Sequence, residues 1–129
     1  METRSLLGIH LIKIASIYML ASLALGYYMG MTHAFAMISV HSHIGLLGWT
    51  TMALAGLIYV NAPRCDGTRP AQAHFWLHNL GLPIMIAGLV WNTNSPGGQA
   101  EAVIGVGSSL VLVALLFFAI NLFKNCRNQ

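Results

Sequence analysis

Two histidines separated by one residue, His41 and His43, stand in a stretch over residues 34–62 that carries no charged side chain. In a helix, residues two positions apart project about 200° from each other, so the two imidazoles reach nearly opposite faces. Neutral imidazole is a common protein ligand of haem iron and copper, and ionisable side chains in hydrocarbon usually mark functional sites. The pair therefore predicts a haem-iron or copper site. The alternative is that both histidines join neighbouring helices by hydrogen bonds.

Small residues follow the pair on the same segment, among them Gly45, Gly48 and Gly56. Small side chains allow another backbone, or a flat cofactor, to approach a helix closely. Ordinary helix packing explains these glycines equally well, so they do not decide between the two interpretations.

Three further histidines, His10, His74 and His78, are weaker metal candidates. His74 and His78 are four residues apart and share a helix face, a spacing that suits a metal ion. All three lie near the same end of their helices, where polar side chains commonly reach the membrane interface, as Lys13 is expected to do. Both a convergent non-haem metal site and a set of interfacial residues fit this pattern.

The chain as a whole is far more apolar than a soluble domain. Of its 129 residues, 57% are hydrophobic and 7% charged, with a mean hydropathy of +0.70. Apolar segments near 6–31, 35–62, 71–92 and 101–123 are each long enough to cross a membrane, which takes about 20 helical residues. Because lipid leaves backbone groups no partners outside a helix, we expect an all-α, four-helix transmembrane bundle. It would form a single domain over residues 1–129.

The basic residues predict the orientation of this bundle. All of them fall on one side of it: Arg4, Lys13, Arg64, Arg69, Lys124 and Arg127. Since cytoplasmic loops are rich in Lys and Arg, both termini and the 63–70 loop are expected in the cytoplasm, and His33, His41 and His43 toward the outer face. Cys65 and Cys126 fall on the reducing side, so no disulfide is expected between them.

Several function classes are excluded. No basic stripe with interleaved aromatic residues suggests nucleic acid as a partner. The chain has only three acidic residues and no nucleotide-binding loop or nucleophile with a base, which excludes hydrolases and kinases.

The histidine motifs resemble the catalytic subunit of the haem-copper oxidases, most closely the branch of C-type cytochrome c oxidases and nitric oxide reductases. The tenth helix of that subunit carries His-x-His and then Leu-Gly-Trp, matched here by His41-Ser42-His43 and Leu47-Gly48-Trp49. A Thr-His dipeptide eight residues ahead of the pair recurs as Thr32-His33. Residues 73–77 are similar to the start of the eleventh helix, and Asn121 to a position of the twelfth. The chain thus resembles the last four of twelve helices.

The resemblance implies a b-type haem. In the family motif the second His binds the low-spin haem, which makes His43 an axial ligand and leaves His41 to a second haem, a metal or an open gas-binding position. Gly45, Gly48 and Trp49 would surround the cofactor. The outward position of the family's haem ligands agrees with the orientation expected from charge.

The resemblance also leaves parts of the family site without a counterpart. The histidines that bind its copper ion and its catalytic tyrosine lie on helices that this chain lacks. The Asp and Trp that usually follow the Thr-His are replaced within residues 34–36. The second axial ligand of a low-spin haem would come from His33 or, preferably, from a histidine of a neighbouring copy.

The leading hypothesis is a haem b-binding protein of a bacterial-type inner membrane, acting in electron transfer or in sensing of oxygen or nitric oxide. Its expected partners are membrane lipid, an electron-donor protein or quinol, and further copies of itself in a trimer or dimer. A second hypothesis is that an oligomer or a partner supplies the missing ligands, those of a copper ion among them, and that the assembly reduces oxygen or nitric oxide. The sequence thus leaves open whether the protein is an enzyme. A third hypothesis is a non-haem metal carrier or sensor that uses His10, His74 and His78.

Overall fold

The computed structural model describes residues 6–126, and the regular structure in that range is entirely helical, which confirms the all-α class. The elements are α1 (Leu6–Thr32), the 3₁₀ turn η1 (Phe35–Met37), α2 (Ile38–His43), the π-helix η2 (Ile44–Thr51), α3 (Met52–Asn61), α4 (Pro63–Asp66), α5 (Arg69–Asn94) and α6 (Gly98–Asn125). Arg4 and Arg127, which contributed to the predicted orientation, lie outside the described residues.

Within residues 6–126, four helical stretches are long and apolar enough to cross a membrane, as predicted. They are Leu6–Thr32, Phe35–Asn61, Arg69–Asn94 and Gly98–Asn125, and the second of them comprises η1, α2, η2 and α3. Each begins and ends within a few residues of the expected bounds. The earlier start of α5 has a local cause, since the Thr68 hydroxyl oxygen accepts the N–H of Ala71 at 3.2 Å and caps the helix. The chain is a multi-pass membrane protein.

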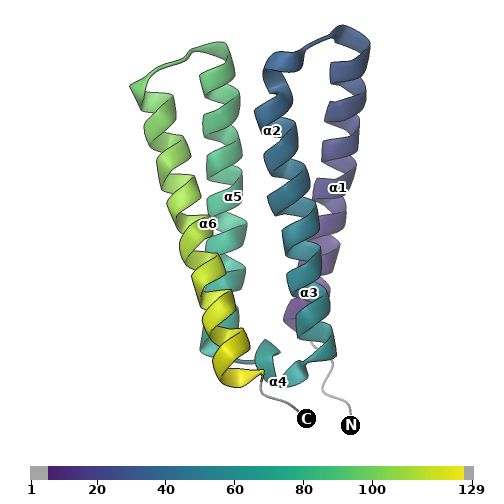
Figure 1. The fold of residues 1–129 in the computed structure, drawn as a ribbon, viewed down its shortest axis with the longest axis vertical. Coiled ribbons are helices and arrows are strands. Elements are labelled where there is room, and N and C mark those ends of the chain that lie inside the picture. The colour runs from purple at the N-terminus through teal and green to yellow at the C-terminus, as the bar shows by residue number, and fades with distance from the viewer. Residues whose placement is uncertain (1–5, 127–129) are drawn as a thin grey trace.

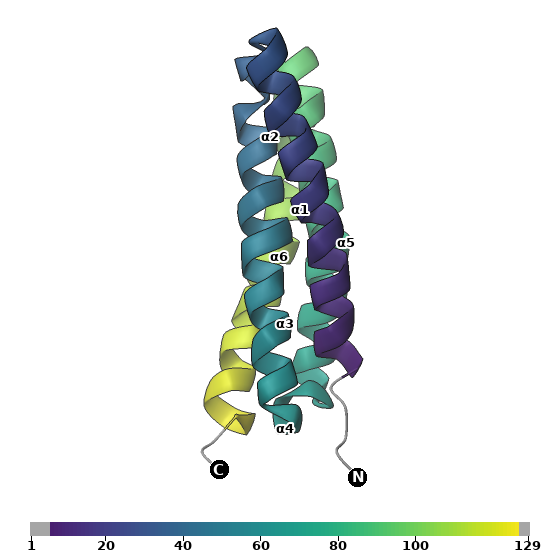
Figure 2. The ribbon, with the colours of Figure 1, turned by 90° about the vertical axis from the view of Figure 1, so that its right-hand side faces the viewer.

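The spans form two antiparallel hairpins (Figure 1). In the first, α1 runs beside α2, η2 and α3, as the perpendicular view also shows (Figure 2). In the second, α5 packs against α6. α4 joins the hairpins at the end where α1 begins and α6 ends, which we call the inner end after the expected orientation. The α1–η1 and α5–α6 connections lie at the opposite, outer end.

Glycines allow the helices of each hairpin to approach closely. A Cβ atom on Gly56 of α3 would lie 2.8 Å from the carbonyl oxygen of Gly8 in α1. A Cβ on Gly88 of α5 would lie 2.8 Å from the backbone nitrogen of Ile104 in α6. At these two positions the small residues serve helix packing, one of the two interpretations that the sequence left open for Gly56.

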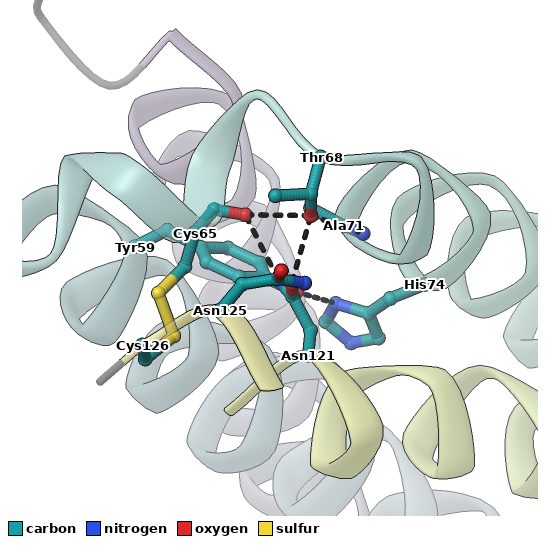
Figure 3. The surroundings of a disulfide bond; sticks show 8 residues. All are labelled: Tyr59, Cys65, Thr68, Ala71, His74, Asn121, Asn125 and Cys126. Carbon is teal, nitrogen blue, oxygen red and sulfur yellow. Dashed lines mark hydrogen bonds between the residues drawn. A yellow bond between two sulfur atoms is a disulfide. The ribbon is translucent and has the colours of Figure 1, made fainter. Parts of the chain in front are cut away.

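The inner end is held by a disulfide between Cys65 of α4 and Cys126, whose Cα atoms lie 5.4 Å apart (Figure 3). The structure therefore contradicts the expectation that no disulfide joins these cysteines, and it shows that the two residues are placed to form one on oxidation. The reason is topological, because α4 closes the turn between the hairpins at the end where α6 finishes. Asn121 strengthens this junction, since its Nδ2 donates to the Cys65 carbonyl at 2.9 Å and its Oδ1 accepts the Thr68 hydroxyl at 2.8 Å.

Candidate functional site

His41 lies near the outer end of the second span with its ring against α1. Its Nδ1–H donates to the carbonyl oxygen of Ser22 at 3.0 Å, because a carbonyl can only accept. The Ser22 hydroxyl is a further neighbour, 3.4 Å from Nδ1. A Cβ atom on Gly26 would lie 2.9 Å from the Cε1 of His41, so this glycine makes room for the ring. In the neutral imidazole held this way, Nε2 carries the lone pair.

His43 is held in the same manner, but by its own helix. Its Nδ1–H donates to the carbonyl oxygen of Ser39 at 2.7 Å, so Nε2 again carries the lone pair. The side chain is half-buried and projects to the opposite side of the helix from His41. An imidazole whose Nδ1–H is fixed by a backbone carbonyl, with Nε2 left over, has the arrangement found in metal-ligating histidines.

An open groove of about 400 Å³ lies beside His41. Its lining residues come from α1, α2 and η2: Ser22, His41, Ser42, Gly45, Leu46, Trp49 and Thr50. Gly45 and Trp49, which the family resemblance placed near the cofactor, are among them. The groove thus combines an imidazole, small residues and an indole ring, a mixture that suits a flat, partly apolar ligand.

Two other predicted cofactor-binding residues lie elsewhere: Gly48, expected beside the cofactor, and His33, a candidate second axial ligand. Gly48 is buried against α1, where a Cβ atom would lie 2.5 Å from the Cγ of Tyr18, so its small size serves helix packing. His33 is exposed between α1 and η1, with a φ of 56° in the left-handed region. Neither residue lines the groove beside His41.

The residues directly after the histidine pair wind as a π-helix, η2, over Ile44–Thr51. Segments of this kind within α-helices are frequent at functional sites. The sequence does not predict η2, because an almost uniformly apolar stretch has no periodicity that separates a π-helix from an α-helix. The only signal is Gly45 and Gly48, since glycine weakens an ordinary helix.

His74 and His78 form a second pair in the inner part of α5, and both side chains are fully buried. Their rings meet edge to face, with centroids 5.5 Å apart and planes at 78°. The hydroxyl of Tyr59 lies 3.1 Å from the Nδ1 of His74 (Figure 3). The Nε2–H of His78 donates to the carbonyl oxygen of Leu47, in η2, at 3.0 Å. Full burial contradicts the interpretation of this pair as interfacial residues.

Each histidine of this second pair keeps one ring nitrogen without a partner. Within residues 6–126, the His74 Nε2 and the His78 Nδ1 are buried and form no hydrogen bond. His10 does not join them, because its side chain is exposed on α1. In the described part of the chain no group of three or more His, Cys, Asp or Glu side chains is placed to hold a metal ion. The convergent site of His10, His74 and His78 is therefore not formed there.

The partners that fix the histidines were missed in the sequence. Ser22 and Gly26 meet His41, and Tyr59 meets His74. Ser22 and Gly26 stand four residues apart on one face of α1, a small-residue spacing that marks close helix contact. Such a spacing does not reveal which side chain of the neighbouring helix enters the gap.

Comparison of the chain with known protein families, curated protein sequences and solved structures gave no match.

Proposed function

We propose that this membrane protein binds b-type haem through the helix that carries His41 and His43, and that it transfers electrons or senses a diatomic gas. The observation that carries the proposal is the hydrogen bonding of the two imidazoles. Each donates its Nδ1–H to a backbone carbonyl, at 3.0 Å for His41 and 2.7 Å for His43, and each keeps the Nε2 lone pair for iron. The resemblance to the haem-copper oxidase subunit gives the same two residues.

The two histidines have different roles in this proposal. Following the family motif, His43 is an axial ligand of a low-spin haem, and His41 faces a second haem, a metal or an open gas-binding position. The groove of about 400 Å³ beside His41 offers space on that side. Haem supplies one-electron redox chemistry or a gas-binding position when bound. The chain's own residues orient the imidazoles, through the carbonyl oxygens of Ser22 and Ser39.

A low-spin iron needs a second axial ligand, and we propose that a histidine of a neighbouring copy supplies it in a homo-oligomer. Polar side chains on the outside of the second span support this step, since Ser39 and Thr50 are exposed. Polar groups facing lipid are unfavourable, so a protein surface or a cofactor is the better neighbour for them. The expected membrane is a bacterial-type inner membrane, and an electron-donor protein or a quinol is the expected redox partner.

An optical spectrum of the purified protein and its variants tests the proposal. Wild type is expected to show Soret and alpha bands of b-type haem. His43→Ala is expected to lose the low-spin bands or the haem itself, whereas His41→Ala keeps those bands and changes carbon monoxide binding. His10→Ala, at an exposed position of α1, is the matched control and should leave the spectrum unchanged.

Two outcomes would contradict the assignment. An unchanged spectrum in both His41→Ala and His43→Ala would remove the proposed ligands. Loss of haem in a His74→Ala, His78→Ala double variant, with His41 and His43 (the outer pair) intact, would move the site to His74 and His78 (the inner pair). Mass measurement in nanodiscs addresses the oligomer separately, because a monomer with full haem content would remove the shared-ligand arrangement.

A further inference from the structure

The inner pair, His74 and His78, has no role in the proposed haem site, yet it has the features of a ligand set. Both side chains are fully buried, and the His74 Nε2 and His78 Nδ1 have no hydrogen-bond partner among residues 6–126. Buried polar atoms are nearly always satisfied in native proteins, so two of them on neighbouring rings call for a shared partner.

The hydrogen bonds of the other two nitrogens decide what that partner is. Because the His78 Nε2–H donates to the Leu47 carbonyl at 3.0 Å, the Nδ1 of the neutral ring carries a lone pair. The Tyr59 hydroxyl, 3.1 Å from the His74 Nδ1, can accept as well as donate. When it accepts, the His74 Nε2 also carries a lone pair. Two lone pairs on rings 5.5 Å apart, each backed by a hydrogen bond on its other nitrogen, are suited to a metal ion.

We propose that His74 Nε2 and His78 Nδ1 bind one soft monovalent metal ion, of the Cu(I) class, in a site separate from the haem. The number of ligands favours this class, because a d¹⁰ monovalent ion can be held by as few as two ligands. Zinc usually takes four ligands, and the described residues place no third His, Cys, Asp or Glu beside the pair.

The apolar surroundings of His74 and His78 also favour a metal ion of low charge. Phe118 packs against the site, with its ring centroid 5.0 Å from that of His74 and 5.6 Å from that of Tyr59. The cost of moving an ion from water into such an apolar site rises with the square of its charge. A divalent ion would need carboxylates or thiolates to offset that cost, and Cys65 and Cys126 are joined in the disulfide.

Silver(I) is the probe that tests this site, because it shares the charge, the softness and the low coordination number of Cu(I) and needs no reductant that would open the disulfide. Full-length, air-oxidised protein in detergent is titrated with silver nitrate, desalted and analysed for metal. We expect one retained silver ion per chain. His74→Leu, which keeps the His78–Leu47 hydrogen bond, is expected to lose it, whereas His10→Leu retains it. Tyr59→Phe removes the group behind the His74 ring and is expected to weaken binding about 10- to 100-fold.

A measurement on the wild-type protein keeps the test independent of whether the variants fold. Nitrogen NMR of histidine-labelled protein should show silver-dependent shifts at the His74 Nε2 and the His78 Nδ1. Silver retained with these two nitrogens unshifted, equal retention by His74→Leu, or tighter binding of zinc(II) than of silver(I) at the pair would each overturn the proposal. None of these outcomes depends on haem, so the two proposals fail separately.

Discussion

The outer and inner histidine pairs use the same residue type for two different geometries. His41 and His43 are two residues apart, half-buried, and point to opposite sides of one helix. His74 and His78 are four residues apart, fully buried, and meet ring against ring. Spacing therefore decides whether two imidazoles serve two partners or share one. The pairs differ in access as well: the groove beside His41 is open, whereas the side chains of His74 and His78 are fully buried.

The nitrogens that each pair commits to hydrogen bonds differ as well. Both outer rings use Nδ1 and keep Nε2, the nitrogen farther from the backbone. The inner rings use different nitrogens, Nδ1 in His74 and Nε2 in His78, so that the two remaining nitrogens are one of each kind. The pairs are also connected, because His78 donates to Leu47 inside η2, which begins directly after His43.

The largest predicted effect concerns which compartment each pair faces. A reporter enzyme fused at Asn94 should show that this residue lies outside the cytoplasm. A reporter enzyme fused at the C terminus should show that the terminus lies inside it. If the inner end is cytoplasmic, Cys65 and Cys126 are expected to be thiols in growing cells, because that compartment is reducing, and to form their disulfide on oxidation. Acid quenching followed by denaturation and alkylation should then label both cysteines in wild type, and one in the Cys65→Ser control.

The opposite result would reverse the orientation of the bundle in the membrane. A disulfide already formed in quenched cells, together with an inside signal at Asn94, would place the inner pair on the oxidising side. The argument that the outer pair, His41 and His43, lies toward the outer face of the membrane would then be lost, although the contacts within each pair would be unchanged.

A smaller effect is predicted for the hydrogen bond that connects the pairs. His78→Leu leaves the Leu47 carbonyl without its donor in a buried setting, which should lower the free energy of unfolding by about 1–3 kcal/mol. His78→Gln keeps an N–H donor of similar reach and should lose less. Unfolding of the protein in mixed detergent micelles measures both variants. Equal losses for Leu and Gln would show that this hydrogen bond does not stabilise the fold.

Much of the fold could be predicted because a membrane makes hydropathy decisive. The four spans follow from segments of sufficient apolar length, and their bounds agree with the structure to within a few residues. The disulfide could not be predicted, since it depends on α4 and the end of α6 meeting in space and not on any spacing of Cys65 and Cys126.

The sites were predictable in part, for a related reason. Helix geometry gives the relative directions of His41 and His43, but not the neighbour that each ring meets. The burial of His74 and His78 depends on how the two hairpins pack, and in a nearly uniformly apolar sequence no polar face indicates that packing. Gly48 illustrates the limit: the sequence left cofactor contact and helix packing equally open, and its neighbour is Tyr18.

The smallest predicted effect is confined to the outer pair and separates His41 from His43. A Cβ atom in Gly26→Ala would lie 2.9 Å from the His41 Cε1, so the ring must move by a few tenths of an ångström and weaken its 3.0 Å hydrogen bond to the Ser22 carbonyl. A whole bond of this kind is worth about 0.5–1.5 kcal/mol, so weakening it should change carbon monoxide affinity by no more than about tenfold if His41 adjoins the gas-binding position. Gly30→Ala on the same helix is the control for the Gly-to-Ala change itself, because its Cβ would meet nothing within 4 Å. The low-spin bands assigned to His43 should be unchanged in both variants, since His43 projects away from α1. Equal shifts in Gly26→Ala and Gly30→Ala would show that helix propensity, and not the position of the His41 ring, controls gas binding.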